Sequence, residues 1–449
     1  MVGELSGALS RSELLRGALG VAAVAGGFRA GAAVSVIGSP RLPQVTGPYE
    51  QIGCRLLRAG PTRARVKVFY PASAPSSTVA PYCTDGRETS DGMAGLVGFR
   101  QLGLSYLLAH LAGASSGCWL DAAPASGDEL PLLCYSHGFG GNMDMATYLM
   151  RQMASYGVVV AAIEHTDGTA SRTIEENGQA LPFSPRLLSR EAQLRRRADE
   201  LLAVAQPGAL GTGLPAIDRS RVFLGGHSYG GPTALLASTL PDASTAGISG
   251  LLLHDPALGM NAGIDAAVSG VRRSGSPLPT LSYVSDEYDA ARVRCGTTAH
   301  VIGGRHGNFV DAPLWAPLWV MRPLSAIIPA AGPVDPRRLH SELASTGSCF
   351  MRSASASSAA SISQLLELRG GLCGSPSPSS SASFPSPFGA MTAWRTARLN
   401  RFAAAFDASR YHAQILFVDD DGARAVREHP RPRRHATRHG SLRHACCVR

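Results

Sequence analysis

The sequence predicts an α/β fold, a mostly parallel central sheet with helices on both faces. One observation is a strand-like apolar run, Val222–Leu224, that leads through a glycine-rich turn into helix-like residues from Pro232 onward. Another is that later apolar runs of strand length are followed by acids or histidine, as strands of open α/β sheets often are at their carboxyl ends. These runs are Gly250–His254, Pro279–Val284 and Ala299–Ile302. In such a fold the site lies above the carboxyl ends of the central strands.

The turn itself, Gly226–Gly230, has the pattern Gly-x-Ser-x-Gly. Between a strand and a helix this pattern is typical of a nucleophile elbow, a turn so sharp that only small residues fit beside the serine. We therefore expect Ser228 to be a nucleophile. The alternative is an ordinary glycine-rich turn before a helix, because a chain with 50 glycines contains such strings by chance.

A serine hydroxyl is a weak nucleophile unless a histidine accepts its proton and an acid orients that histidine. In folds with such an elbow these partners follow in the order Ser, Asp or Glu, His. The strand ends after Ser228 offer Asp255 and then His306, so we expect these three residues to form a catalytic triad. Two alternatives stay open: Asp255 is a turn residue and His306 a loop histidine, or an acid of the intervening strand end replaces Asp255. The acids of that strand end are Asp286, Glu287 and Asp289.

Acyl transfer also needs N–H donors for the oxyanion that develops in the transition state. Glu129–Tyr135 is strand-like and runs into the His-Gly loop Ser136–Gly141. Such a loop supplies one backbone donor, and the residue after the nucleophile supplies the other. We therefore expect the backbone N–H groups of Phe139 and Tyr229 to form an oxyanion hole. His137 precedes the elbow and is expected to bond to the backbone of its own loop.

Separated blocks of the chain carry a family resemblance through their joint order. They are Gly47–Tyr49 with Gly53–Cys54, Val68–Pro71, Ser136–Gly138, Val160–His165 with Asp167, Gly226–Gly231, and His306–Phe309 with Asp311. Together they resemble the platelet-activating factor acetylhydrolases of the plasma and intracellular type II kind, over roughly residues 46 to 350. Tyr229 replaces the phenylalanine of that family's elbow.

The resemblance implies an α/β-hydrolase fold and a calcium-independent serine esterase. Such an enzyme removes short or oxidised acyl chains from the sn-2 position of glycerophospholipids, as a 1-alkyl-2-acetylglycerophosphocholine esterase does. In that family the acid follows the sixth strand, which favours Asp255, although Pro256–Ala257 here departs from the usual aromatic residue. The alternatives are a general carboxylesterase or lipase, and a catalytically silent lipid-binding protein of the same fold.

No metal or other cofactor is expected, because the sequence has no His-Glu-x-x-His, no paired Cys-x-x-Cys and no EF-hand loop. The expected partner is a phospholipid, at a membrane or lipoprotein surface. The formal charge of +9 comes almost entirely from arginine, with Lys67 the single lysine, so we interpret it as composition bias and expect no nucleic-acid partner. Nine scattered cysteines indicate no disulfide framework, and the oligomeric state is not indicated.

Two further helices are expected. Apolar residues from Leu96 to Leu111 recur at helical spacing, which suits either core packing or a lipid-facing surface. In the resembled family a helix near this position helps to form the lipid-facing rim. The lipid-facing residues would be Phe99, Leu102, Tyr106 and Leu107. A second helix, Leu187–Ala205, would cover the sheet and carry a solvated face. Its arginines are Arg190, Arg195, Arg196 and Arg197.

The expected catalytic domain spans residues 46–352. Residues 1–45 are expected to be a leader, either a targeting segment or disordered. Residues 353–390, rich in serine, proline and alanine, are expected to be a disordered linker. Residues 391–449 form a basic appendage of unknown role, with a strand-like run at 414–418. A cytoplasmic or organellar location is favoured, and secretion is the alternative if residues 1–38 are a signal segment.

Overall fold

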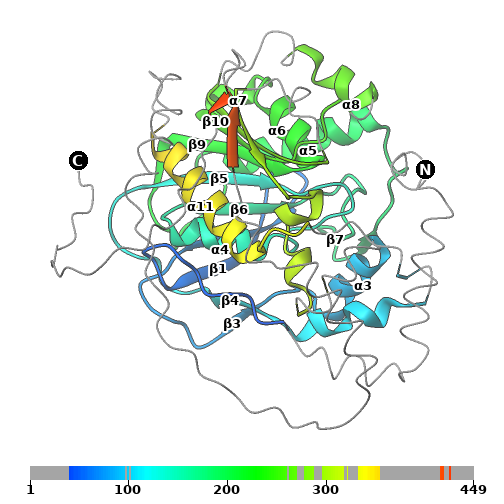
Figure 1. Cartoon of the computed structure of the whole chain (residues 1–449), viewed down its shortest axis with the longest axis vertical. Helices are drawn as coiled ribbons and strands as arrows, with labels where there is room; N and C mark the ends of the chain where they lie inside the picture. Colours follow the sequence, from blue (N-terminus) through cyan, green and yellow to red (C-terminus); the bar gives the residue numbers. More distant parts are fainter. Residues whose placement is uncertain are drawn as a thin grey trace, which may run out of the picture.

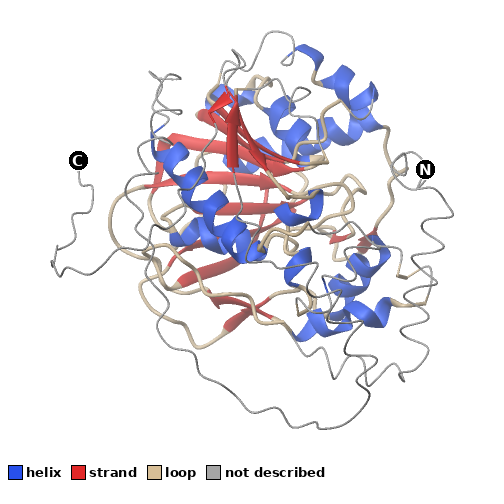
Figure 2. Cartoon of the chain, in the orientation of Figure 1, coloured by secondary structure: helices blue, strands red, loops and turns tan. Residues whose placement is uncertain are grey.

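The computed structural model describes residues 40–96, 99–100, 103–259, 262–270, 278–287, 296–317, 321, 332–353, 415–418 and 424–425. Within these ranges the chain forms one large sheet with helices on both faces (Figures 1 and 2). The predicted α/β fold class is therefore confirmed. Residues 1–39 of the expected leader and 354–390 of the expected serine-rich linker lie outside the described residues, whereas Leu42 and Val45 pack against the core.

The large sheet has the strand order β14-β13-β12-β11-β10-β9-β5-β6-β2-β1-β4-β3. The six strands from β12 to β6 in this order run parallel to one another, and β2 lies antiparallel to both β6 and β1. A separate small sheet pairs β7 with β8. The strands are β1 (Ile52–Ala59), β2 (Ala64–Pro71), β3 (Val79–Pro81), β4 (Ser115–Leu120), β5 (Leu130–Ser136), β6 (Val159–Glu164), β7 (Arg172–Ile174), β8 (Ala180–Pro182), β9 (Ile217–His227), β10 (Ile248–His254), β11 (Thr280–Ser285), β12 (Thr297–Val301), β13 (Ile415–Val418) and β14 (Arg424–Ala425).

Helices α4 and α11 cover one face of the sheet, and α5 and α6 cover the opposite face. Figure 1 shows α11, in yellow, crossing the near face. The helices are α3 (Arg87–Leu96), α4 (Thr147–Ser155), α5 (Arg190–Ala205), α6 (Gly230–Ala237), α7 (Asp242–Thr245), α8 (Ala262–Ala267) and α11 (Pro336–Ser353), with 3-10 helices η1 (Ser105–Gly113), η3 (His306–Phe309) and η4 (Ala312–Leu314).

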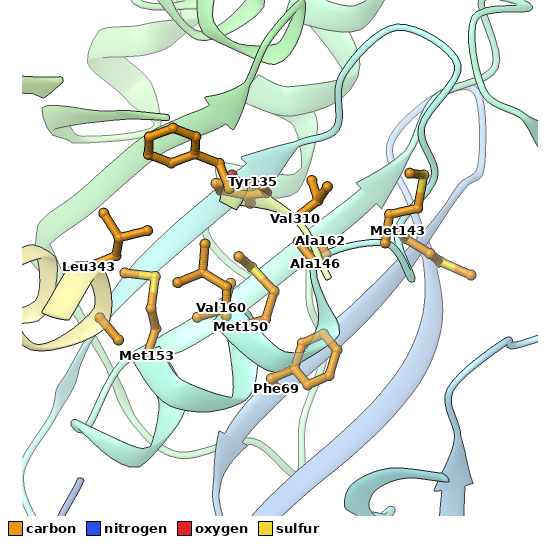
Figure 3. Packing of buried hydrophobic residues seen from close by; sticks show 14 of the residues in the cluster. Phe69, Tyr135, Met143, Ala146, Met150, Met153, Val160, Ala162, Val310 and Leu343 are labelled. Atoms are coloured by element: carbon orange, nitrogen blue, oxygen red, sulfur yellow. The ribbon is translucent and has the colours of Figure 1, made fainter. Parts of the chain in front are cut away.

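The alternation of side chains along the strands produces a core on each face. On β6, Val160 points to the face covered by α4 and α11, where Met150, Met153 and Leu343 pack around it (Figure 3). Its neighbour Val159 points to the α5 and α6 face. Both faces of the central strands are therefore buried, which explains why these strands are continuous apolar runs in the sequence.

Within the range Leu96–Leu111, where one helix was expected, α3 ends at Leu96 and the 3-10 helix η1 begins at Ser105. Phe99 is 8% exposed and belongs to the hydrophobic core, so its ring does not form a lipid-facing surface. Of the two interpretations of this segment, core packing agrees with the burial of Phe99, which lies between α3 and η1. Tyr106 and Leu107 are half-buried. Leu102 lies outside the described residues.

The strand-like run near the C-terminus extends the large sheet. β13 pairs antiparallel with β12, and β14 pairs with β13. Within the described ranges, no helix is both long enough and apolar enough to cross a bilayer.

Asp311 connects the segment after β12 to the start of α4. Its buried carboxylate accepts a hydrogen bond from the backbone N–H of Tyr148 (2.9 Å). The Nδ1 atom of buried His340 lies 3.9 Å from the other carboxylate oxygen. Burial raises the pKa of Asp311 to about 8 and lowers the pKa of His340 to about 4. At mildly acidic pH this contact therefore joins two neutral groups.

We expect Asp311→Asn to change how stability depends on pH. The folded carboxyl keeps its proton up to about pH 8, whereas an unfolded aspartate loses it near about pH 4. Protonation of Asp311 therefore contributes to the wild-type free energy of unfolding at low pH, and this contribution decreases as pH rises between those values. The asparagine variant lacks this part of the slope. Urea unfolding of both proteins at several pH values tests this, and equal pH slopes would contradict it.

Candidate active site

Ser228 lies in a sharp turn between β9, which ends at His227, and α6, which begins at Gly230. Its φ angle is +56°, in the left-handed region that few residues other than glycine adopt. A Cβ atom at Gly230 would lie 2.0 Å from the carbonyl oxygen of Ser136, and one at Gly226 would lie 2.5 Å from the Gly230 carbonyl group. Glycine is therefore required at both positions, and the strain at Ser228 is held by its surroundings.

Two backbone hydrogen bonds join Ser228 to the end of β10. Its N–H donates to the carbonyl oxygen of His254 (3.1 Å), and its carbonyl oxygen accepts from the N–H of Ala257 (2.9 Å). Asp255 and Pro256 lie between these two residues, so the turn that carries the serine and the turn that carries the acid are directly connected.

Asp255 is fully buried and also has a positive φ of +46°. One carboxylate oxygen accepts from the backbone N–H of Ser285 (2.7 Å). The other accepts from the Ser285 hydroxyl (2.9 Å) and contacts Nδ1 of His306 at 2.6 Å. Since a carboxylate oxygen accepts, Nδ1 is the donor in this contact, and Nε2 is the ring nitrogen left to accept a proton. This is the tautomer that a general base needs.

His306 begins η3 and is held by its backbone as well as by Asp255. Its N–H donates to a carboxylate oxygen of Glu287 (2.7 Å), and its carbonyl oxygen accepts from Nε2 of His227 (3.1 Å). The two imidazole rings lie 4.4 Å apart between centroids. Burial lowers the pKa of His227 well below its usual value, so this ring is a neutral donor. The His306 ring therefore lies beside the residue that precedes Ser228.

The Ser228 hydroxyl makes no hydrogen bond to His306 within the described part of the chain. In serine hydrolases this bond is often long before the substrate is bound and shortens in the reacting complex. The structure thus brings Asp255 and His306 into direct contact and holds the His306 ring next to the serine turn.

The other acids proposed for the triad have different contacts. Asp286 contacts Nε2 of His300 and the backbone N–H of Gly303, each at 2.8 Å. Glu287 contacts the backbone of His306 and not its ring. Asp289 lies outside the described residues.

Phe139 and Tyr229 present backbone N–H groups near the serine. A Cβ atom at Gly138 would lie 3.0 Å from the Ser228 Cβ, so the His-Gly loop lies directly against the elbow. Among the hydrogen bonds of the described residues, neither N–H has a partner. The rings of Phe139 and Tyr229 meet edge to face at 5.8 Å, and the Arg190 guanidinium lies 4.3 Å from the Phe139 ring centroid. The N–H of Phe139, one residue after Gly138, and the N–H of Tyr229, one residue after Ser228, are therefore both without a hydrogen bond among the described residues.

Known proteins resemble the chain in sequence. A family model described as platelet-activating factor acetylhydrolase, isoform II, matches residues 34–196. The platelet-activating factor acetylhydrolase of Cavia porcellus is 26% identical over 235 residues, 45% of this chain and 53% of the relative. That of Bos taurus is 25% identical over 248 residues, again 45% of this chain and 53% of the relative. The resemblance to the platelet-activating factor acetylhydrolase family is confirmed.

The chain spans about half the length of the curated acetylhydrolases it matches. The matched range of the acetylhydrolase family model includes the His-Gly loop and ends before Ser228. Among solved structures, a ferulic acid esterase from Streptomyces cinnamoneus has a TM-score of 0.52 at 21% identity, covering 70% of this chain and 92% of that structure. This likeness shows the α/β-hydrolase fold.

His137 of the acetylhydrolase-like His-Gly loop is a structural residue. Its Nδ1 contacts the carbonyl oxygen of Gly138 (2.7 Å), and its Nε2 accepts from the backbone N–H of His165 (3.3 Å). Burial lowers its pKa well below the usual value. The ring is therefore neutral and bonded to backbone.

The contacts of three residues near the site were not predicted from the sequence. Ser285, which donates twice to Asp255, follows an apolar run and was not distinguished from the acids after it. His227 was included in the elbow pattern without a role of its own. Arg197 was expected on a solvated face, together with Arg195 and Arg196; those two are exposed, but Arg197 is fully buried. The physical reason is a set of acceptors, described below, that satisfies its guanidinium.

Among the described residues, no three His, Cys, Asp or Glu side chains are grouped so that they could hold a metal ion.

Proposed function

We propose that this chain is a serine esterase in which Ser228 is the nucleophile, His306 the general base and Asp255 the acid that orients it. The observation that carries the proposal is the 2.6 Å contact between Asp255 and Nδ1 of His306, beside a serine held at a positive φ. The combination of a strained strand-to-helix serine, a correctly tautomerised histidine and a buried acid is the arrangement that acyl transfer requires.

In the proposed reaction, Ser228 Oγ attacks the ester carbonyl carbon while His306 Nε2 takes its proton. The oxyanion accepts hydrogen bonds from the N–H groups of Phe139 and Tyr229. Collapse breaks the ester bond, and His306 donates the proton to the leaving alcohol. The same histidine then takes a proton from water, which attacks the acyl-enzyme. As the acid product leaves, His306 gives that proton to Ser228 Oγ. Asp255 stays ionised and stabilises the imidazolium through its bond to Nδ1.

We propose further that the substrate is a phospholipid with a short or oxidised sn-2 acyl chain, and that the reaction needs no calcium. The support is the resemblance to the acetylhydrolase family and the names of the curated relatives. The lipid would be taken from a membrane or lipoprotein surface. We assign the catalytic unit to residues 46–352, since the described core extends through α11.

Turnover of a series of phosphatidylcholines that differ only in sn-2 chain length tests the substrate proposal. We expect the acetyl ester to be hydrolysed at least about tenfold faster than a palmitoyl ester. This ratio corresponds to a difference of about 1.4 kcal/mol in transition-state binding. A chelator should leave the rates unchanged. Equal rates for both chain lengths, together with rapid cleavage of p-nitrophenyl acetate, would instead indicate a general carboxylesterase.

A further inference from the structure

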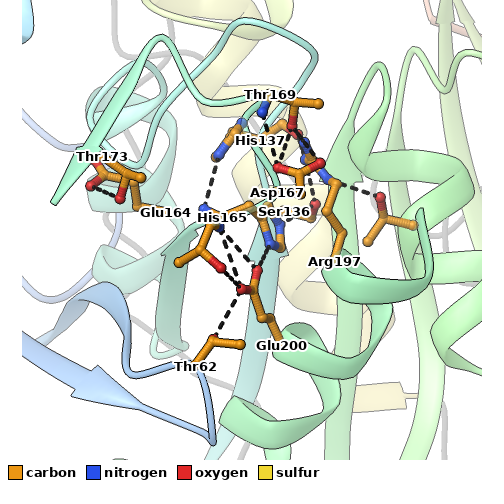
Figure 4. Close-up of polar contacts among 12 residues, drawn as sticks. Thr62, Ser136, His137, Glu164, His165, Asp167, Thr169, Thr173, Arg197 and Glu200 are labelled. Carbon is orange, nitrogen blue, oxygen red and sulfur yellow. Dashed lines mark hydrogen bonds and ion pairs between the residues drawn. The ribbon is translucent and has the colours of Figure 1, made fainter. Parts of the chain in front are cut away.

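Arg197 lies in α5 behind the His-Gly loop and is the largest fully buried side chain of the described residues. Its two neighbours in sequence, Arg195 and Arg196, are exposed on the same helix. Figure 4 shows its guanidinium directed toward the loop that carries His137. A buried charge is retained only where hydrogen bonds compensate its desolvation.

The guanidinium donates to the start of the His-Gly loop and to a neighbouring segment. Its Nη2 donates to the carbonyl oxygen of His137 and to the Ser136 hydroxyl (3.0 Å). Its Nη1 donates to the Thr169 hydroxyl (2.6 Å), which belongs to the segment after β6. That segment is itself bonded to the loop, because the carbonyl oxygen of Thr169 accepts from the N–H of Gly140 (2.7 Å). Arg197 therefore contacts the loop directly before Phe139 and is linked through Thr169 to Gly140 after it.

The same guanidinium also reaches the elbow. Its Nε donates to the Thr233 hydroxyl (3.2 Å), and that hydroxyl donates to the carbonyl oxygen of Tyr229 (2.9 Å). The guanidinium carbon lies 5.0 Å from the Tyr229 ring centroid, a cation–π contact. The position of Tyr229 is therefore tied to that of the His-Gly loop through Arg197.

A second set of buried groups holds the acceptors in place. The Ser136 hydroxyl contacts Nε2 of His165 (2.8 Å), and Nδ1 of His165 contacts Glu200 (2.8 Å). Thr169 also bonds to Asp167, whose carboxylate contributes a compensating negative charge to Arg197. The Ser136 and Thr169 hydroxyls that accept from Arg197 are therefore themselves hydrogen-bonded, which restricts where the guanidinium can lie (Figure 4).

We propose that Arg197 is the positioning residue of the oxyanion hole: it sets the backbone N–H groups of Phe139 and Tyr229 at the spacing that an oxyanion requires. The inference rests on the proposed function. Arg197 touches neither substrate nor reacting atoms in this role. It acts by holding two donors that come from separate segments, and donors misplaced by a fraction of an ångström lose most of their effect.

The primary test compares Arg197→Lys with wild type on p-nitrophenyl acetate. Lysine keeps the charge but cannot contact all three segments at once. We expect kcat per active site, titrated with a fluorophosphonate, to fall about 100-fold, the loss typical of one oxyanion donor, with KM changed less than about threefold. Affinity for a trifluoromethyl ketone, whose hemiketal carries an oxyanion, should fall in parallel with kcat. Arg196→Lys, the matched control on the same helix, should match wild type.

If Arg197→Lys does not unfold in a cooperative thermal transition, and so is not correctly folded, a second variant tests the same proposal. Thr233→Val removes only the hydroxyl between Arg197 and the Tyr229 carbonyl and preserves side-chain volume. This variant should lower kcat about fivefold and lower the affinity for the trifluoromethyl ketone by a similar factor. A wild type that neither turns over esters nor reacts with the fluorophosphonate would refute the proposed function itself. An active wild type with folded variants of unchanged kcat and ketone affinity would overturn the role of Arg197 alone.

Discussion

Replacing Ser228 with alanine is expected to lower kcat for ester hydrolysis by about a million-fold, the loss typical of removing a catalytic serine. The reason is that no acyl-enzyme can form without its hydroxyl, and only the oxyanion donors and substrate binding remain to assist water. The substitution leaves the backbone bonds of residue 228 to His254 and Ala257 in place. Initial rates on p-nitrophenyl acetate and on an sn-2 acetyl phospholipid measure the effect.

The matched control for this result is Ser238→Ala. Ser238 is the C-cap of α6, the helix that follows the elbow, and among the described residues its hydroxyl donates to the carbonyl oxygen of Leu235 alone. Its activity should stay within about twofold of wild type. If Ser228→Ala kept a tenth or more of the wild-type rate while folding normally, Ser228 would not be the nucleophile.

Asp255→Asn is expected to lower kcat by about 10⁴-fold, because an amide in place of the carboxylate favours the wrong tautomer of His306. The carboxylate now accepts two hydrogen bonds from Ser285 and contacts Nδ1 of His306. An asparagine NH₂ group in that position would donate to Nδ1, which moves the imidazole proton to Nε2 and removes the base. Steady-state kinetics across pH, with the melting temperature of each variant, separate this loss from unfolding.

Glu287→Gln is the control that distinguishes the two candidate acids. Glu287 contacts the backbone N–H of His306, and a glutamine oxygen can accept the same bond. We therefore expect a loss of less than about tenfold. A loss of about 10⁴-fold in Glu287→Gln, together with only a small loss in Asp255→Asn, would instead identify Glu287, which follows β11, as the acid.

The positions of Ser228, Asp255 and His306 could be predicted from the sequence because each follows an apolar strand. Parallel strands that are neighbours in a sheet bring their carboxyl ends to one edge, and β9, β10, β11 and β12 are consecutive neighbours. The strand pattern therefore places the three residues together without any knowledge of loop structure. The choice among acids could not be made this way, since Asp255 and Glu287 reach the same edge and differ only in which atoms of His306 they contact.

Arg197 could not be placed because helical periodicity assigns a charged residue to the solvent side. On α5 the buried apolar stripe contains Leu194, Ala198 and Leu201, and Arg197 and Glu200 lie next to it. The burial of Arg197 depends on acceptors from the His-Gly loop and from the segment after β6, and that of Glu200 on donors from Thr62, His165 and Thr166, all distant in the chain. The sequence feature that could have indicated this burial is the charged pair Arg197 and Glu200, three residues apart beside the apolar stripe.

The pairing of β13 with β12 depends on contacts between segments that are far apart in sequence. Local composition predicts a strand at such a position but not its neighbour in the sheet. The same limit applies to Phe99, whose burial follows from the way two short helices pack on the core.

Trapping the acyl-enzyme is the most direct test of the central claim, that the elbow serine and the Asp255–His306 pair act together in covalent catalysis. The protein would be mixed with p-nitrophenyl acetate, quenched in acid within the burst phase, digested and mapped by mass spectrometry. We predict one acetyl group per active site, on the peptide that contains Ser228, and none in the His306→Ala variant. An acetyl group on a different residue, or ester turnover with no burst and no acetylated peptide, would contradict the account.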